Sequence, residues 1–177
     1  MSEAGRERAR GALGADDGPI EIVSYEPSWR DAYVAERERL AALFPGLEIL
    51  HIGSTAVPGL PAKRVIDMIA LVDDLDATAE LLIQRAGYHM PAPFNRDLLH
   101  RRYLCYPSAS YRTHHLHLVD VREHMDRCLR FRDLLSHDRH LAANYVALKR
   151  SLAERFQDDR DGYTAAKGDF IDLALSE

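Results

Sequence analysis

The pattern of apolar and polar positions predicts strands alternating with helices over most of the chain. β-Branched and aromatic residues at 20–25 predict a first strand, and a second is predicted at about 47–52. The nearly continuous apolar run at 64–72 is typical of a central strand covered on both faces. Residues 98–106 and 113–120 are extended segments that predict an antiparallel hairpin. A hairpin beside a covered central strand indicates a mixed sheet.

Apolar residues at helical spacing fill the segments between and after these strands. One helix is predicted to begin at Ser28, which can cap it, and to stop at Pro45. A second covers 75–86 and ends at Gly87, where a left-handed cap fits. From about residue 121 onward, three helices close the chain. The pattern predicts an α/β (α+β) fold, with a mixed β-sheet flanked by helices and a helical C-terminal third.

Composition sets the domain boundary and limits the partners. The chain has 177 residues, 46% of them hydrophobic and 29% charged, which is typical of one globular domain. Residues 1–18 lack large apolar side chains and are predicted to be a disordered N-terminal tail, so the domain spans 19–177. The net charge of −5 disfavours nucleic acid and anionic membranes as partners.

Cysteine usage and hydropathy indicate a cytoplasmic protein. The two cysteines, Cys105 and Cys128, form neither a zinc-binding motif nor a disulfide framework. The sequence contains no apolar stretch long enough for a membrane span and no signal-peptide core.

Asp67 is the most informative residue, because it places a charge inside the apolar run 64–72. A carboxylate buried among aliphatic side chains costs several kcal/mol unless a cation, hydrogen-bond donors or protonation compensates. Either a bound group supplies that compensation, or Asp67 lies at the edge of the sheet and caps a loop through Ser54 or Thr55.

Several histidines are candidates for the same site. Strand alternation places His115 and His117 on one face, roughly 6.5 Å apart at about 3.3 Å per residue, with His114 on the other. Imidazoles at this spacing can share a metal or bracket a phosphate, or they can simply lie on a half-exposed face. His51 would join them and Asp67 if its strand neighbours the central one; alternatively, it is a core histidine bonded to backbone.

The loop after the second strand offers a second kind of chemistry. Gly53, Ser54 and Thr55 combine small side chains, hydroxyls and free backbone amides, which suit a phosphate. The spacing is not that of a P-loop, and Lys63 follows the loop rather than starting a helix. Basic residues that can add positive charge nearby are Lys63, Arg64, Arg101, Arg102 and Arg112.

The motifs of this region closely resemble those of the GrpB family of the nucleotidyltransferase superfamily. The resemblance begins at residues 51–60, His-Ile-Gly-Ser-Thr-Ala-Val-Pro-Gly-Leu, and covers roughly residues 20–175. It continues through Ala62-Lys63, Val65-Ile66-Asp67, Gly87-Tyr88, His115-Leu116-His117-Leu118, Phe131-Arg132-Asp133, Tyr145 with Leu148-Lys149, and Lys167 with Phe170-Ile171.

This resemblance implies a nucleotidyltransferase-like core. It also allows the superfamily's phosphate-binding and metal-binding residues to be compared with the residues of this sequence. In the superfamily, a Gly-Ser pair meets nucleotide phosphates and two carboxylates two residues apart hold metals. Gly53, Ser54 and Asp67 match, but Ile69 occupies the second carboxylate position. Two metals about 3.5 to 4 Å apart need bridging anionic ligands. Either a histidine of the pair above completes a one-metal site, or the protein binds without turnover.

Two functions from different classes follow. The first is a nucleotide-binding protein with a nucleotidyltransferase-like cleft. In its enzymatic form, this hypothesis is a metal-dependent nucleotidyl or phosphoryl transferase that acts on a small molecule. Its assigned residues are Gly53, Ser54, Thr55, Lys63, Arg112 and Lys149 for the phosphates of a nucleoside triphosphate; Asp67, His115, His117 and His51 for Mg, Mn or Zn; and Asp67, His115 and His117 for catalysis. The second is a non-catalytic accessory domain for a protein partner, because related domains occur fused to dephospho-CoA kinase.

Overall fold

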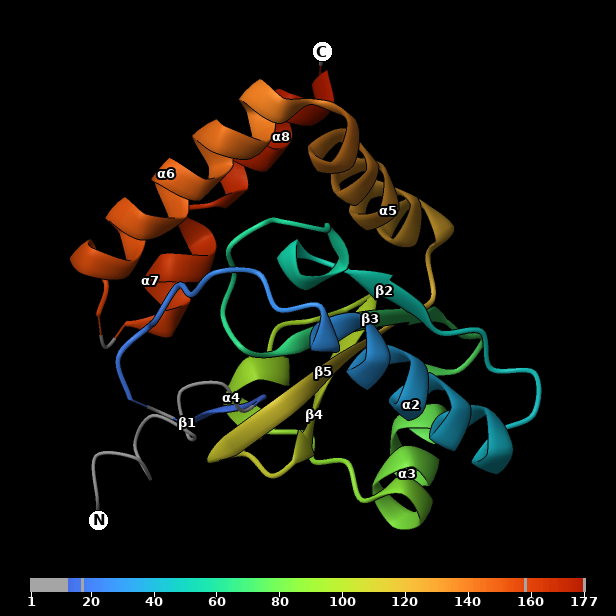
Figure 1. Ribbon diagram of the computed structural model, residues 1–177. Coiled ribbons are helices and arrows are strands. Elements are labelled where there is room, and N and C mark those ends of the chain that lie inside the picture. Colours follow the sequence, from blue (N-terminus) through green and yellow to red (C-terminus); the bar gives the residue numbers. More distant parts are fainter. Residues whose placement is uncertain (1–12, 17, 158, 177) are drawn as a thin grey trace.

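A five-stranded mixed sheet forms the centre of the molecule (Figure 1). The computed structural model describes residues 13–16, 18–157 and 159–176. The strand order is β1-β5-β3-β2, with β4 also paired to β5; β3 runs parallel to β5, and the other pairs are antiparallel. The strands are β1 (Ala15–Asp16), β2 (Leu50–Ile52), β3 (Ile66–Leu71), β4 (Arg101–Pro107) and β5 (Tyr111–Val119). The predicted mixed sheet and β4–β5 hairpin are confirmed.

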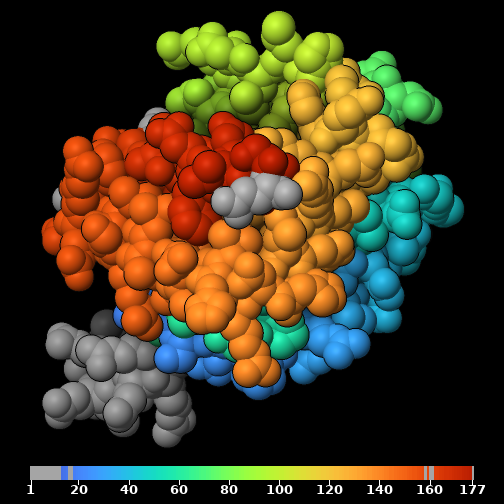
Figure 2. All heavy atoms as spheres, turned by 90° about the horizontal axis from the view of Figure 1, so that it is seen from above, coloured from blue at the N-terminus to red at the C-terminus, as the bar shows by residue number. Residues whose placement is uncertain are grey.

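Different helices cover the two faces of this sheet. The helix α2 (Ser28–Leu43) and the helix α3 (Leu75–Ala86) pack on one face through a core that includes Trp29, Leu82 and Met68. The opposite face meets α5 (Arg122–His137), whose Met125 packs on Ile69. The remaining helices are η1 (Ser54–Ala56), α4 (Ala92–Asn95), α6 (Arg139–Arg155), α7 (Arg160–Ala165) and α8 (Gly168–Ser176). Seen from above, the C-terminal helices in orange and red make up most of the visible surface (Figure 2).

Alternation along β3 decides what each face receives. Three of its side chains are fully buried in the core beneath α2 and α3: Ile66, Met68 and Ala70. Asp67 and Ile69 project to the other face, because successive side chains of a strand point to opposite sides. The apolar run therefore serves two layers, and its one acid lies on the side of the C-terminal helices.

Local signals located some helix ends correctly and others not. Gly87, at φ 72°, ends α3 in the left-handed conformation, and Asp74 caps its start by accepting from two backbone amides. At α2, however, the cap position is Pro27, and Ser28 is the first helical residue, with no side-chain cap. Local chemistry explains both ends of α3. For α2, the predicted extent is right but the predicted capping role of Ser28 is wrong.

The first predicted strand, at residues 20–25, is wrong. The segment makes a single bridge, between Val23 and Ala62, rather than a regular strand. Its apolar residues are buried in another way, since Ile20 packs with Leu152 and Tyr163 of the C-terminal helices. The segment therefore buries β-branched side chains against helices, without pairing as a strand of the sheet.

The two ends of the chain also differ from expectation. Four helices, not three, follow β5 within residues 120–157 and 159–176, because Asp159 accepts a hydrogen bond from the Gly162 amide and starts α7 as a separate helix. Of the predicted tail, β1 pairs with the start of β5, and residues 1–12 and 17 lie outside the described part. No helix among the described residues has the length and apolar character needed to cross a membrane.

Candidate functional site

Asp67 and His115 form a hydrogen-bonded pair on the face toward the C-terminal helices. They lie directly opposite each other in the parallel β3–β5 pair, and Asp67 Oδ1 is 2.9 Å from His115 Nδ1. Burial pushes the pKa of Asp67 upward, but the hydrogen bond from His115, helped by Lys63, holds it below its usual range. The Asp67 side chain is 33% exposed, so this ionised acid remains open to a bound group.

The Gly53-Ser54 turn lies against this acid. Gly53 has φ +70°, and a Cβ atom there would lie 2.8 Å from Asp67 Oδ2, so only glycine fits the position. The next residue, Ser54, begins η1, and its Oγ accepts a 2.8 Å hydrogen bond from Lys149 Nζ. Lys149 also donates to the Pro61 carbonyl at 2.5 Å. The predicted turn, acid and lysine are therefore gathered in one place.

The sequence has 23 Lys and Arg residues, of which only three are lysines, and all three lysines lie near this turn. The ammonium groups of Lys63 and Lys167 lie 5.3 and 4.3 Å from the ring centroid of Tyr163. Lys149, which is 3% exposed, lies 4.9 Å from the ring centroid of Tyr145. The loop before β3, the helix α6 and the turn between α7 and α8 thus each contribute one residue to a cationic cluster, which we call the lysine cluster: Lys63, Lys149 and Lys167.

Burial and mutual repulsion lower the pKa of two members of the lysine cluster. Burial, followed by repulsion from Lys167 and Lys63, lowers the pKa of Lys149 to about 7. Burial and repulsion from Lys63 likewise lower the pKa of Lys167 to about 8. Asp67 acts in the opposite direction on both, but it does not restore either pKa to its ordinary value. Crowded ammonium groups of this kind gain stability when an anion arrives.

His51 lies on the opposite face of the sheet from Asp67. In the antiparallel β2–β3 pair, Asp67 is opposite Ile52, whereas His51 is opposite Met68. The imidazole stacks on Tyr33 of α2, with ring centroids 4.5 Å apart. β2 and β3 are neighbours, which was the condition for His51 to join Asp67, but the register puts Ile52 rather than His51 on the Asp67 face.

His51 nevertheless contacts the turn formed by Gly53, Ser54 and Thr55. Its Nε2 lies 3.0 Å from Thr55 Oγ1, so Thr55 is engaged with the histidine rather than with the lysine cluster. Its backbone oxygen accepts a 2.9 Å hydrogen bond from Arg132 of α5. Burial lowers the pKa of His51 to about 4. Its contacts are to a side-chain hydroxyl and a ring, not to a metal shell.

The predicted metal shell is not formed among the described residues. No group of three or more His, Cys, Asp or Glu side chains there is placed to hold an ion. His117 shares the face of His115, at 6.5 Å between ring centroids, but its Nδ1 lies 2.5 Å from an Arg101 nitrogen. Ile69, at the superfamily's second carboxylate position, packs with Met125 in an apolar cluster. These donors do not fit a two-metal centre.

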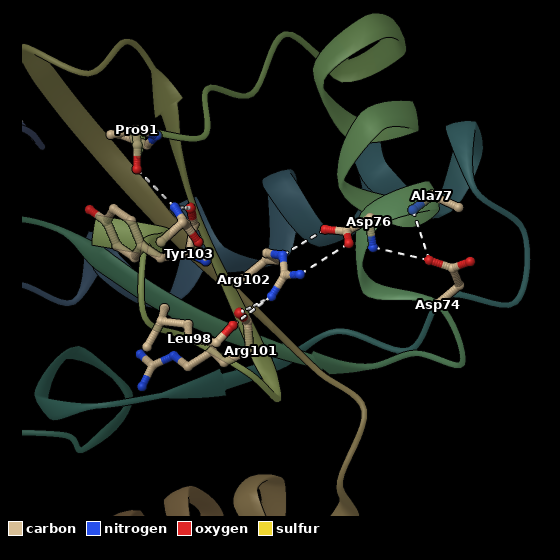
Figure 3. A network of polar contacts seen from close by, with 9 residues as sticks. Asp74, Asp76, Ala77, Pro91, Leu98, Arg101, Arg102 and Tyr103 are labelled. Carbon is tan, nitrogen blue, oxygen red and sulfur yellow. Dashed lines mark hydrogen bonds and ion pairs between the residues drawn. The ribbon is translucent and has the colours of Figure 1, made fainter. Parts of the chain in front are cut away.

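Two basic residues named from the sequence lie outside the lysine cluster. Arg112 is 4% exposed at the start of β5, opposite Ala15, and its charge contributes to lowering the pKa of His115 after burial and Lys63. Arg102 pairs with Asp76 of α3, on the other side of the strand from Arg101 (Figure 3). Neither belongs to the lysine cluster.

Sequence reasoning missed two contributors to this face of the sheet. Lys167 was noticed only as part of a family motif, although the scarcity of lysine among so many arginines was a usable signal. Tyr103, opposite His117 in the β4–β5 pair, has its ring centroid 5.0 Å from that of His115 and 5.6 Å from that of His117. Its place follows from the hairpin register, which the pattern alone did not supply.

The fold and site define a small mixed α/β domain in which an ionised acid lies next to a turn and a cluster of lysines. A family model described as "GrpB protein" matches residues 19–177. The chain therefore belongs to the GrpB family.

Relatives and a solved structure agree with this assignment. The UPF0157 protein PA4798 of Pseudomonas aeruginosa is 36% identical over 89% of this chain, which spans 66% of that relative's length. A protein named dephospho-CoA kinase from Mycolicibacterium paratuberculosis is 32% identical over 84% of this chain, which spans 43% of its length. The crystal structure of GrpB from Enterococcus faecalis has a TM-score of 0.74 and 30% identity, covering 88% of this chain and 98% of that one.

Proposed function

We propose that this protein binds a polyphosphate ligand, with a nucleoside triphosphate as the leading candidate, at the lysine cluster beside Ser54. The observation that carries the proposal is the gathering of all three lysines around one turn, with the pKa of Lys149 lowered to about 7. A ligand with several negative charges offsets the mutual repulsion of three ammonium groups, which a single neutral oxygen such as Ser54 Oγ does not.

The surroundings of the cluster suit phosphate oxygens. In the proposed complex, Lys149 and Ser54 turn from each other toward the ligand, and Lys63 and Lys167 add charge from the side of Tyr163. Asp67 offers one carboxylate to a Mg²⁺ ion that arrives on the phosphates, which is a common way for proteins to bind this ion. The nucleoside part of the proposal rests on the resemblance to nucleotidyltransferases.

The donor set favours binding over two-metal transfer. Nucleotidyl transfer by two ions needs a second bridging anion, and Ile69 in its apolar cluster supplies none. A role for His117 as an additional ligand would require it to leave Arg101. We therefore propose a binding function for the site and derive no transfer step.

Thermal unfolding with ATP tests the proposal. ATP at a hundredfold excess over its dissociation constant should stabilise the protein by about 2.7 kcal/mol, measured with and without Mg²⁺, Mn²⁺ or Zn²⁺. Lys149→Met should abolish the shift, whereas Arg150→Met, an exposed neighbour on α6, should retain it. No shift at millimolar ATP with any of these ions, or an equal shift in both variants, would contradict the proposal.

A second candidate function is that of an accessory domain for a partner enzyme. The observation that favours it is the relative named dephospho-CoA kinase, in which this chain matches 43% of the length. Co-purification with a separate dephospho-CoA kinase, unchanged by Asp67→Asn, would support this function. Both candidates fit the predicted cytoplasmic location.

A further inference from the structure

Two consecutive arginines of β4 have opposite surroundings. Arg102 donates to both carboxylate oxygens of Asp76, at 2.7 and 3.0 Å, and to the carbonyls of Leu98 and Arg101 (Figure 3). Arg101 leaves the strand in another direction, toward the face that carries His117. Strand alternation explains the split, and it gives Arg101 a partner of a different kind.

Arg101 has no carboxylate partner among the described residues. Its side-chain contacts there are to His117, at 2.5 Å from Nδ1 and 3.4 Å from Nε2, and its Nε is buried without a hydrogen-bond partner. Burial lowers the pKa of Arg101, an effect only partly offset by Cys128, Asp67 and Tyr103. A guanidinium does not deprotonate in proteins, so Arg101 stays charged in a partly desolvated environment.

His117 supplies an acceptor but no negative charge. Burial, followed by the charge of Arg101, lowers the pKa of His117 well below its ordinary value, so its ring is neutral. The charged and titratable groups that face this pair come from four other positions: Asp67 on β3, Tyr103 on β4, His115 on β5 and Cys128 on α5. Asp67 already accepts from His115, so the positive charge remains largely unpaired.

We propose that Arg101, together with His117 and Tyr103, binds the carboxylate of a small molecule on the face of the sheet that carries Asp67. A carboxylate matches the planar fork of a guanidinium and brings the single charge that one arginine needs. The ring of Tyr103, at 5.6 Å from that of His117, provides a flat apolar wall beside it. This site goes beyond the proposed phosphate site, because none of its three residues belongs to the lysine cluster.

Formate, the smallest carboxylate, is the probe that tests this site. Thermal unfolding is measured in potassium formate and in potassium chloride at equal ionic strength. The wild-type protein should unfold at a higher temperature in formate, and Arg101→Met should remove that difference. Arg102→Met is the matched control: it loses the Asp76 pair but should keep the whole formate effect.

Two further readings make the result unambiguous. Arg101→Met should leave the protein at least as stable in chloride as the wild type, because it removes an unpaired buried cation; Arg101→Lys should keep the charge but weaken the formate effect. Equal unfolding temperatures of the wild type in the two salts, or a formate effect that survives Arg101→Met, would overturn the proposal. Stabilisation by ATP should persist in Arg101→Met, so failure of this site is distinguishable from failure of the phosphate site.

Discussion

The two faces of the sheet hold buried charges in different ways. On the face toward α2, Glu36 is 6% exposed and accepts from Arg39 at 2.8 and 2.7 Å and from the Tyr88 hydroxyl at 2.8 Å. On the other face, Lys149 is 3% exposed but donates only to neutral oxygens. The first cluster balances its charge internally, whereas the Lys149 ammonium group donates to neutral oxygens and is repelled by Lys167 and Lys63.

The pKa shifts have opposite signs in the two clusters. The hydrogen bond to Glu36 raises the pKa of Arg39 despite burial, as expected for a cation with an acidic partner. Burial and neighbouring lysines lower the pKa of Lys149 to about 7. The Glu36 cluster thus stabilises the charged form of its cation, whereas the lysine cluster disfavours the charged forms of Lys149 and Lys167, a property that is frequent at functional sites.

The largest expected effect is on the pH dependence of stability at Lys149. Above pH 7 the folded protein has lost the Lys149 proton, whereas the unfolded chain keeps it up to about pH 10.5, so stability should rise with pH in this window. Lys149→Met should remove about 3 kcal/mol of this rise between pH 7 and 9.5, at 1.4 kcal/mol per pKa unit. Urea unfolding at several pH values measures it; parallel curves for variant and wild type would break the contrast between the clusters.

A smaller effect is expected at Glu36. Glu36→Gln leaves Arg39 without its carboxylate and weakens the Tyr88 contact, which should cost about 2–3 kcal/mol, below the usual range because Arg39 is 35% exposed. The exposed Glu38 on the same helix is the control, and Glu38→Gln should change stability by less than about 0.5 kcal/mol. Chemical denaturation at pH 7 compares them, and equal stabilities would show that the Glu36 cluster is not structural.

The sequence predicted features that depend on neighbours along the chain. The left-handed Gly87 and the β4–β5 hairpin follow from local chemistry, and Asp67 was recognised because a charge interrupts an apolar strand. The sequence left the face of His51 open, because the register between β2 and β3 is set by tertiary pairing. Lys167 joins Lys63 across about a hundred residues, and only the folded chain brings them together over Tyr163.

The same limit explains why the sequence did not separate Arg101 from Arg102. From the sequence, Arg101 and Arg102 are equivalent basic residues, and both could add charge near the loop. The difference between them depends on whether an acid of α3 or a neutral imidazole of β5 lies opposite. Neither contact is encoded by spacing along the chain.

Lysine titration by NMR tests the central claim most directly, since a protein labelled with ¹³C at lysine Cε has three side-chain signals to resolve. Two of them, from Lys149 and Lys167, should titrate with midpoints near pH 7 and 8, and ATP should raise both midpoints by about one pH unit or more as its phosphates pair with the ammonium groups. Lys149→Met identifies the first signal by its loss. Three midpoints near the ordinary value of 10.5, or midpoints that ATP leaves unmoved, would contradict the account.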